Sequence, residues 1–482
     1  MLPPRRPSLA IAAALAVLCL SAPAWAHAFG IRYDLPLPLW LYLVGAGAAV
    51  ALSFAIMALF LRDQGEGVER LQVDLLAVPG LGWLGGAVVL TTLRALSVAV
   101  FALLIAAGLF GDPDPFKNIA PVFVWVVWWV GMAFVSTLIG NLWDLLNPWK
   151  ILFTWLGGAR TESTRAYPAW LGYWPAVLFF LLFVWMELIS EQGEQPRSLA
   201  ILILVYSTIT WAGMALWGRD TWLRHGEAFA AVYGLLARFA PLHGSGGKLI
   251  LRLPSVGLLC REPVTASGIC FVLLLLTSVT FDGILETPMW AAILTWISES
   301  QLLRPLLLFL RDGGIDLIAA IKSVALLLLP LCFVVVFLLT SRLIAWAGGG
   351  ATGIGAVAGS FVLSLVPIAI AYHLAHYLSY LLIAGQNIIP MVSDPFGWGW
   401  DLFGTVGYAV DIGVVNAKMV WYLAVTAIVV GHVLAVYIGH VMATRVFPGR
   451  GPALRSQIPM LLLMVGYTMV SLWILSQPII SD

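Results

Sequence analysis

Charged side chains are scarce in this sequence: Asp, Glu, Lys and Arg make up 10% of its 482 residues. Soluble proteins carry about 25%, so the composition excludes an ordinary soluble domain. The charges also nearly cancel, with 25 Lys and Arg residues against 24 Asp and Glu residues. Because there is no basic excess, and no basic stretch with interleaved aromatic residues, the sequence predicts no nucleic-acid partner.

Cysteine is scarcer still, with four residues in the chain. Cys19 lies in the N-terminal apolar run, and Cys260, Cys270 and Cys332 lie at or within later apolar segments without CxxC spacing. This pattern indicates neither a disulfide framework nor a thiolate metal site. The sequence also lacks a complete Walker A motif and a GxSxG motif, so we expect neither a phosphate-binding loop nor a nucleophile elbow.

Hydrophobic residues, by contrast, make up 61% of the chain. A helix needs about 20 apolar residues to cross a hydrocarbon core of about 30 Å. Ten segments are read as such spans: 39–61, 92–110, 119–141, 169–190, 197–217, 265–285, 317–343, 354–384, 417–443 and 456–478. We therefore predict an all-α fold, a polytopic helical bundle embedded in membrane lipid, with the possibility of an oligomer left open.

The N-terminus has the pattern of a signal peptide. A positively charged start, "MLPPRRPS", precedes the apolar run "LAIAAALAVLCL", and Ala24-Trp25-Ala26 matches a cleavage site. We expect residues 1–26 to be removed and residues 27–482 to form a single transmembrane domain that begins at His27 outside the cytoplasm. An uncleaved signal anchor is the alternative.

Lys and Arg are distributed unevenly between the predicted loops. If the mature N-terminus is outside, most of them fall in or beside the cytoplasmic loops, which are 62–91, 142–168, 218–264, 344–353 and 444–455. The positive-inside rule then predicts that both mature termini lie outside. The two long loops 286–316 and 385–416 are expected on the same outer side.

Histidines interrupt two of the apolar segments. His373 and His376, in "AYHLAHYLSY", are three positions apart and therefore share one helical face, and His432 lies in the next segment. Ionisable groups inside a membrane are costly and usually face the bundle interior. We predict that these three residues, with His27, hold a divalent metal ion, zinc or copper; structural hydrogen bonding is the alternative.

A carboxylate commonly completes a metal site that is built on imidazoles. Asp282, in "TSVTFDGIL", lies deepest in apolar sequence among the acidic residues on the outer side, and we assign it a catalytic role. Glu187 and Glu286 are further acidic candidates. The alternative for Asp282 is an anchor at the membrane interface.

The outer loop 385–416 is rich in glycine and aromatic residues. We predict that Trp398, Trp400 and Phe403 bind an apolar substrate, with an aromatic belt at headgroup level as the alternative. This loop also contains Asp394-Pro395-Phe396, which repeats the Asp114-Pro115-Phe116 of an earlier outer loop. We expect both as turns.

Three stretches resemble a known family: "HAFGIRYDLPLPLWLYL" at 27–43, "GNLWDLLNPWK" at 140–150 and "YHLAHYLSYLLIAGQNIIPMVSDPFGWGWDLFGT" at 372–405. They are similar to bacterial membrane proteins known as fenitrothion hydrolases. The resemblance implies a multi-pass hydrolase of the bacterial inner membrane that cleaves organophosphorus triesters and releases a nitrophenol. A metal-activated water would suit this reaction. The resemblance carries over no catalytic residues.

Two other functional classes remain open from the residues alone. In one, the protein is a transporter or a copper- or zinc-handling permease that uses its buried histidines. In the other, it is a b-type haem protein with axial ligands from neighbouring spans, for instance His376 and His432.

Overall fold

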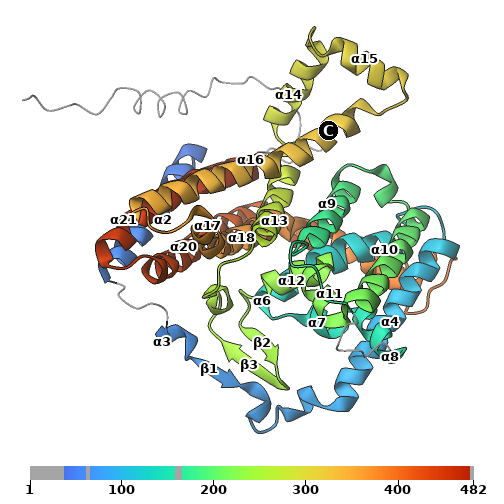
Figure 1. Cartoon of the computed structure of the whole chain (residues 1–482). Coiled ribbons are helices and arrows are strands. Elements are labelled where there is room, and N and C mark those ends of the chain that lie inside the picture. Colours follow the sequence, from blue (N-terminus) through green and yellow to red (C-terminus); the bar gives the residue numbers. More distant parts are fainter. Residues whose placement is uncertain (1–36, 61–65, 158–164, 478–482) are drawn as a thin grey trace, which may run out of the picture. The chain divides into compact units, whose positions relative to one another are not determined.

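The computed structural model describes residues 37–60, 66–157 and 165–477, most of them in helices. Nine of the described helical segments are long and apolar enough to cross a membrane, which confirms the all-α polytopic class. They are α2 (Leu39–Phe60), α4 (Ala87–Phe110), Ile119–Leu138, α10 (Pro196–Trp217), α13 (Ala266–Leu285), α16 (Leu317–Ala347), Ile354–Ser393, α20 (Ala417–Val446) and α21 (Arg450–Leu475) (Figure 1). The predicted signal peptide and His27 lie outside the described residues.

Two of these segments are composite. The first joins α5 (Ile119–Val122) and α6 (Met132–Leu138) through a π-helical stretch, Phe123–Gly131. The second joins α17 (Ile354–Phe361), α18 (Val366–Ala384) and α19 (Ile388–Ser393) through short 3-10 turns. Pro367 is the second residue of α18. Because proline has no amide proton to donate, it is tolerated in this first turn, and the helix restarts there.

The predicted span 169–190 and the predicted loop 286–316 differ from expectation. The span contains α9 (Trp174–Leu188), an apolar helix of 15 residues that is shorter than the other nine segments. The loop is helical, with α14 (Pro288–Glu299) and α15 (Arg304–Asp312) bent by 90° relative to each other. If this bent pair is counted as one span, the described helices that could cross a membrane number ten.

The predicted cytoplasmic loop 218–264 is also more structured than expected. It forms α11 (Arg219–His225) and α12 (Ala228–Leu236), followed by a hairpin of β2 (Leu242–Ser245) and β3 (Lys248–Arg252). The hairpin turns at Gly246 and Gly247, whose φ angles of 56° and 76° suit glycine. The strand β1 (Gln72–Asp74) completes an antiparallel sheet in the order β1-β3-β2.

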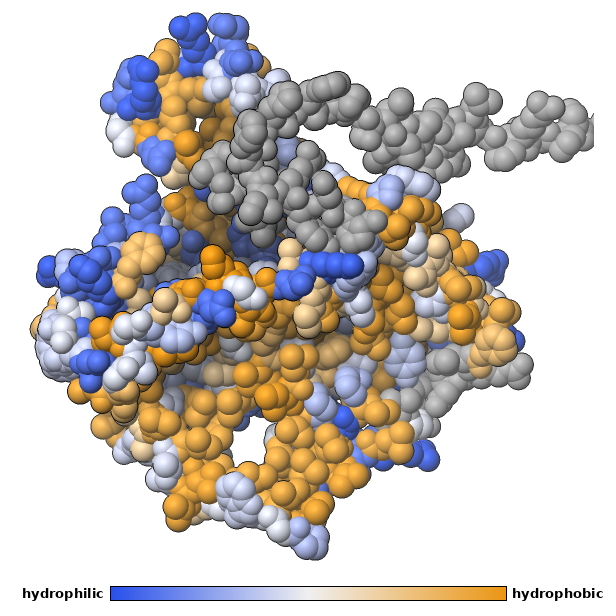
Figure 2. Space-filling model, turned by 180° about the vertical axis from the view of Figure 1, so that it is seen from behind, coloured by the Kyte–Doolittle hydropathy of each residue, from blue (hydrophilic) through white to orange (hydrophobic). Residues whose placement is uncertain are grey.

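Burial separates the interior helices from the lipid-facing ones. In α13 and in the segment Ile354–Ser393, 78% of the most apolar window is buried, against 6% in α4. Apolar side chains such as Val88 (80% exposed) and Leu462 (68% exposed) point outward, and Figure 2 shows a broad hydrophobic surface on one face of the molecule. We infer that lipid covers this surface and that α13 and α18 form the interior.

Close helix packing brings α18 and α20 together. A Cβ atom added at Gly431 of α20 would lie 2.4 Å from the Cβ of Ala371 and 2.7 Å from the carbonyl oxygen of Pro367. Neither distance is possible for a real side chain, so glycine is required where these helices meet. This contact holds α18, which carries His373 and His376, against its neighbour.

Cysteine labelling tests the predicted orientation. In a variant whose native cysteines are replaced, we expect a membrane-impermeant thiol reagent added outside the inner membrane to label Trp400→Cys. Lys248→Cys, in the exposed hairpin, should stay unlabelled until the membrane is opened. The opposite pattern would invert the orientation, because the Lys and Arg asymmetry would then have failed as a guide.

Candidate functional site

Asp282 of α13 and His376 of α18 are in direct contact. The Nε2 atom of His376 lies 2.9 Å from Oδ2 of Asp282, and the hydroxyl of Tyr377 donates to the same oxygen at 2.6 Å. The side chains of His376 and Asp282 are 12% and 18% exposed. The structure therefore places a carboxylate, an imidazole and a phenol together near the end of α13, largely enclosed by the bundle.

The local sequence explains how this contact forms. Tyr372 and His376 are one turn apart on α18, and their rings stack with centroids 6.1 Å apart. A Cβ added at Gly283 would lie 2.5 Å from the Tyr372 hydroxyl oxygen, so glycine at this position leaves room for the Tyr372 side chain of α18 against α13. Asp282 is thereby brought within hydrogen-bonding distance of His376.

His373 lies in a more apolar environment than His376. It is 6% exposed, and its ring contacts Trp129, Phe134 and Tyr377 at centroid distances of 6.1, 6.1 and 4.7 Å. Its Nε2 atom is buried, and none of the described residues forms a hydrogen bond with it. A buried polar atom without a partner costs about 1–3 kcal/mol, so His373 has an unused ligand or proton-accepting atom inside the bundle.

His432 and His440 are buried on α20. His432 hydrogen bonds through Nδ1 to the carbonyl oxygen of Ile428 at 2.8 Å, and its Nε2 has no partner in the described ranges of the chain. Its nearest ring is Tyr467 at 6.2 Å. His440 pairs through Nδ1 with Oε1 of Gln457 at 3.0 Å. Among the described residues, no hydrogen bond or ring contact joins His432 to the Asp282–His376 pair.

The described residues leave the predicted metal site untested. They include no group of three His, Cys, Asp or Glu side chains arranged to hold a metal ion. The Nε2 atom of His376 already faces Asp282, and His432 belongs to a separate contact. Ligation of haem through this nitrogen of His376 would likewise require it to leave Asp282. The metal site, including His27, stays a prediction.

The aromatic residues of the loop 385–416 form their own cluster. The rings of Phe396 and Trp398 stack at 4.4 Å, and Trp400 lies 5.1 Å from Trp398. Trp398, Trp400 and Phe403 are 53%, 39% and 68% exposed. In the described part of the chain, none of these three has a ring contact with His373 or His376, so their role in substrate binding stays a prediction.

The two Asp-Pro-Phe stretches lie against each other. The backbone amide of Asp112 donates to the carbonyl oxygen of Phe396 at 2.7 Å, and that of Ile119 donates to Pro395 at 3.2 Å. Asp114 accepts from the amide of Phe116 at 3.0 Å, which is an Asx turn. The repeated motif therefore joins two loops that are far apart in the sequence and that are both predicted on the outer side.

Two further acidic groups, Glu187 and Glu286, lie near the pair, and Glu286 follows α13 directly. Partial burial is the main cause that raises the pKa of its carboxyl, the nearby His376 opposes this rise, and the nearby Asp282 carboxylate adds to it. A second carboxyl that takes up a proton more readily than usual thus lies next to Asp282 and His376.

Sequence reasoning missed Glu227, which is fully buried. Its carboxylate accepts hydrogen bonds from the Tyr206 hydroxyl (2.6 Å), Asn147 Nδ2 (3.3 Å), and the amides of Phe229 (2.9 Å) and Ala230 (2.7 Å). Burial raises the pKa of Glu227, and these hydrogen bonds oppose the rise. Its sequence position just before an apolar run, typical of a helix N-cap, was the available signal.

The stretch "GNLWDLLNPWK" contacts the carboxylate of Glu227. It forms α7 (Leu142–Leu146) and α8 (Pro148–Trp155), capped by Asn141 and Asn147. Asn147 caps α8 with its oxygen and donates to Glu227 with its nitrogen. This part of the chain is therefore a second polar region, separate from Asp282 and His376.

Comparison of the chain with protein-family models, with curated proteins and with solved structures finds no match in any of the three. We therefore infer the function of the protein from the geometry of these two regions and from the resemblance of its sequence to the fenitrothion hydrolases.

Proposed function

We propose that this protein is a membrane-embedded hydrolase of organophosphorus triesters. The observation that carries the proposal is the contact between Asp282 and His376, with Tyr377 on the same carboxylate oxygen. A carboxylate that holds an imidazole in one orientation is a recurring arrangement for general-base catalysis. The resemblance to fenitrothion hydrolases supplies the substrate class.

The geometry assigns a role to each of the three side chains. An ionised carboxylate only accepts hydrogen bonds, so the contact with Asp282 places a proton on Nε2 of His376 and leaves the lone pair on Nδ1. No hydrogen bond occupies this Nδ1 in the described part of the chain. Nδ1 would take a proton from water while the water oxygen forms a bond to phosphorus. The bond between phosphorus and the aryl oxygen breaks, and a nitrophenolate leaves.

The remaining steps use the same groups. Asp282 stabilises the imidazolium that forms, and Tyr377 fixes the position of the carboxylate by donating its hydroxyl proton to it. The proton on His376 returns to water, which restores the base. An apolar triester dissolves in the bilayer, and lateral entry between helices would bring it to a site near the end of α13.

Nitrophenolate release tests the proposal directly. We expect the purified protein in liposomes to release nitrophenolate from paraoxon, with product followed by its absorbance. His243→Ala, which changes an exposed histidine in the hairpin, should retain this activity. If the wild-type protein shows no release above empty liposomes for either paraoxon or fenitrothion, the proposed substrate class is wrong.

A proton-coupled permease is a second candidate, supported by a different observation. Besides the Asp282–His376 pair, the interior contains the Thr280–Tyr467 hydrogen bond at 2.6 Å, with His432 beside Tyr467 at 6.2 Å. Polar groups on several spans are suited to passing protons. Proton flux into proteoliposomes can be followed with an enclosed pH dye. A flux in a protein that shows no triester hydrolysis would favour the permease.

A further inference from the structure

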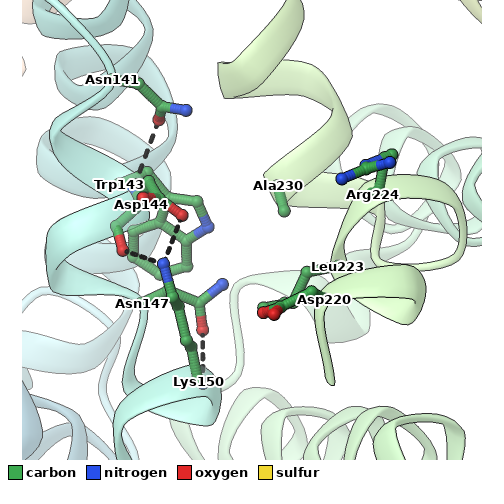
Figure 3. Close-up of a pocket in the computed structure, with 9 residues that line it drawn as sticks. All are labelled: Asn141, Trp143, Asp144, Asn147, Lys150, Asp220, Leu223, Arg224 and Ala230. Carbon is green, nitrogen blue, oxygen red and sulfur yellow. Dashed lines mark hydrogen bonds and ion pairs between the residues drawn. The ribbon is translucent and has the colours of Figure 1, made fainter. Parts of the chain in front are cut away.

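A cavity of about 240 Å³ lies between two parts of the chain that are far apart in the sequence. One wall comes from "GNLWDLLNPWK" and the other from α11 and α12, and Figure 3 shows the two walls facing each other. None of its lining residues belongs to the Asp282–His376 site. The polar and indole side chains that line the cavity include Asn141, Trp143, Asp144, Lys150, Asp220 and Arg224.

The two carboxylates of these walls each have a cationic partner. Asp144 Oδ1 accepts from Lys150 Nζ at 2.5 Å. Asp220 accepts from Arg219 at 2.7 Å and 3.1 Å, one bond to each carboxylate oxygen, and these bonds lower the pKa of Asp220. The Asn141 side-chain oxygen accepts from the amide of Asp144 at 3.2 Å. The two carboxylates are therefore neutralised by their own partners.

The groups left over are donors. The Trp143 indole is 5% exposed, and its buried Nε1–H has no hydrogen-bond partner in the part of the chain that the structure describes. Within the described residues, neither Asn141 Nδ2 nor the Arg224 guanidinium makes a hydrogen bond or an ion pair. Figure 3 shows Asn141 and Trp143 on one wall and Arg224 on the other. Indole and guanidinium nitrogens donate only, so a ligand must supply acceptors.

We propose that this cavity binds a phosphate group. A phosphate carries oxygen acceptors that point in several directions, so it can accept hydrogen bonds from donors on two opposed walls. Its negative charge would also pair with the guanidinium of Arg224. A carboxylate, whose two oxygens lie in one plane, fits this arrangement less well. A volume of about 240 Å³ corresponds to roughly eight water molecules at about 30 Å³ each. That is room for a phosphate group with a small organic substituent.

The phosphate could come from a soluble phosphate ester or from a phospholipid headgroup. Two measurements on the purified full-length protein separate these sources. Calorimetric titration with phosphoethanolamine detects a soluble ligand, and native mass spectrometry detects phospholipid that stays bound after extraction. Binding in either measurement supports the proposal and identifies the source.

Two substitutions remove donors while keeping the local structure. Arg224→Gln changes an exposed side chain, and Asn141→Asp keeps the oxygen that caps α7 but replaces the Nδ2 donor with a second acceptor. A hydrogen bond to a charged group is worth about 1.5–3 kcal/mol, so each change should weaken phosphate binding by about 10- to 100-fold. Trp143→Phe, which keeps an aromatic ring, should also weaken it.

Arg455→Gln is the matched control, because Arg455 is an exposed arginine on α21 that does not line the cavity. Surface substitutions of this kind change free energies by about 0.5 kcal/mol or less, so we expect a change of about 2-fold or less. The proposal is overturned if neither phosphoethanolamine nor phospholipid binds. It is equally overturned if Arg224→Gln and Asn141→Asp bind phosphate as well as Arg455→Gln does.

Discussion

Asp282→Asn should lower the rate of triester hydrolysis by about 100- to 10,000-fold, the range that a positioned general base contributes. Asparagine has nearly the same shape as aspartate, so the helices should pack unchanged. Its amide cannot stabilise an imidazolium, and its NH₂ group can donate to Nε2 of His376, which would move the ring proton to Nδ1. Nδ1 would then carry a proton and could no longer accept one from water. The turnover number, measured by nitrophenolate release in liposomes, checks this.

Substitution of the neighbouring residues separates the roles. His376→Ala should cost at least as much as Asp282→Asn, whereas Tyr377→Phe, which removes one hydrogen bond of 2.6 Å, should cost only about 10-fold. His243→Ala serves as the control for loss of a histidine. If both Asp282→Asn and His376→Ala keep wild-type turnover while the folded protein is recovered normally, this pair does not carry the reaction.

Glu227→Ala should destabilise the fold by about 3–5 kcal/mol, the cost of removing one partner from a buried charged network. The change leaves the donors from Tyr206, Asn147, Phe229 and Ala230 without their acceptor. It also opens a cavity beside α12. We expect a lower thermal midpoint in detergent and less folded protein in the membrane, both measured by size-exclusion chromatography after heating.

Two further variants give thermal midpoints for comparison with Glu227→Ala. Glu227→Gln keeps one side-chain oxygen but adds an NH₂ donor among existing donors, so we expect a smaller but clear loss. Glu262→Ala, at an exposed position, should leave the thermal midpoint unchanged. A wild-type midpoint for Glu227→Ala would show that solvent or rearranged side chains satisfy the four donors.

The interior helices could be anticipated because apolar length and rare ionisable residues are strong local signals. The spacing of His373 and His376 predicted a shared helical face, and the structure separates their surroundings. His376 faces a carboxylate, and His373 lies among aromatic rings. Which residue of another helix contacts each imidazole depends on how the helices pack. Gly283 and Gly431 leave room for the close contacts seen here. Such contacts between distant segments leave no pattern within either segment.

Other features could not be read from the sequence for different reasons. The strands β1, β2 and β3 are short, and β1 pairs with β3 across about 175 residues of chain, as the contact between Leu249 and Asp74 shows. The helices α14 and α15 lie in what was predicted to be a loop, and the 90° bend between them separates two apolar segments that are each too short to be recognised as a span. In the sequence Glu227 resembles a solvated acid, because its partners Tyr206 and Asn147 come from other segments of the chain.

The length of α9 has a consequence for the lipid around it. Its 15 residues rise about 22 Å, whereas the hydrocarbon core is about 30 Å thick. A helix this short that crossed the bilayer would leave a mismatch of about 8 Å, which lipids relieve by thinning locally. Because α9 packs against α13, the thinned zone would border the helix that carries Asp282. There the headgroups and their water would dip toward the acyl chains, and an oily ester and the water that cleaves it could meet over a shorter path than elsewhere in the membrane.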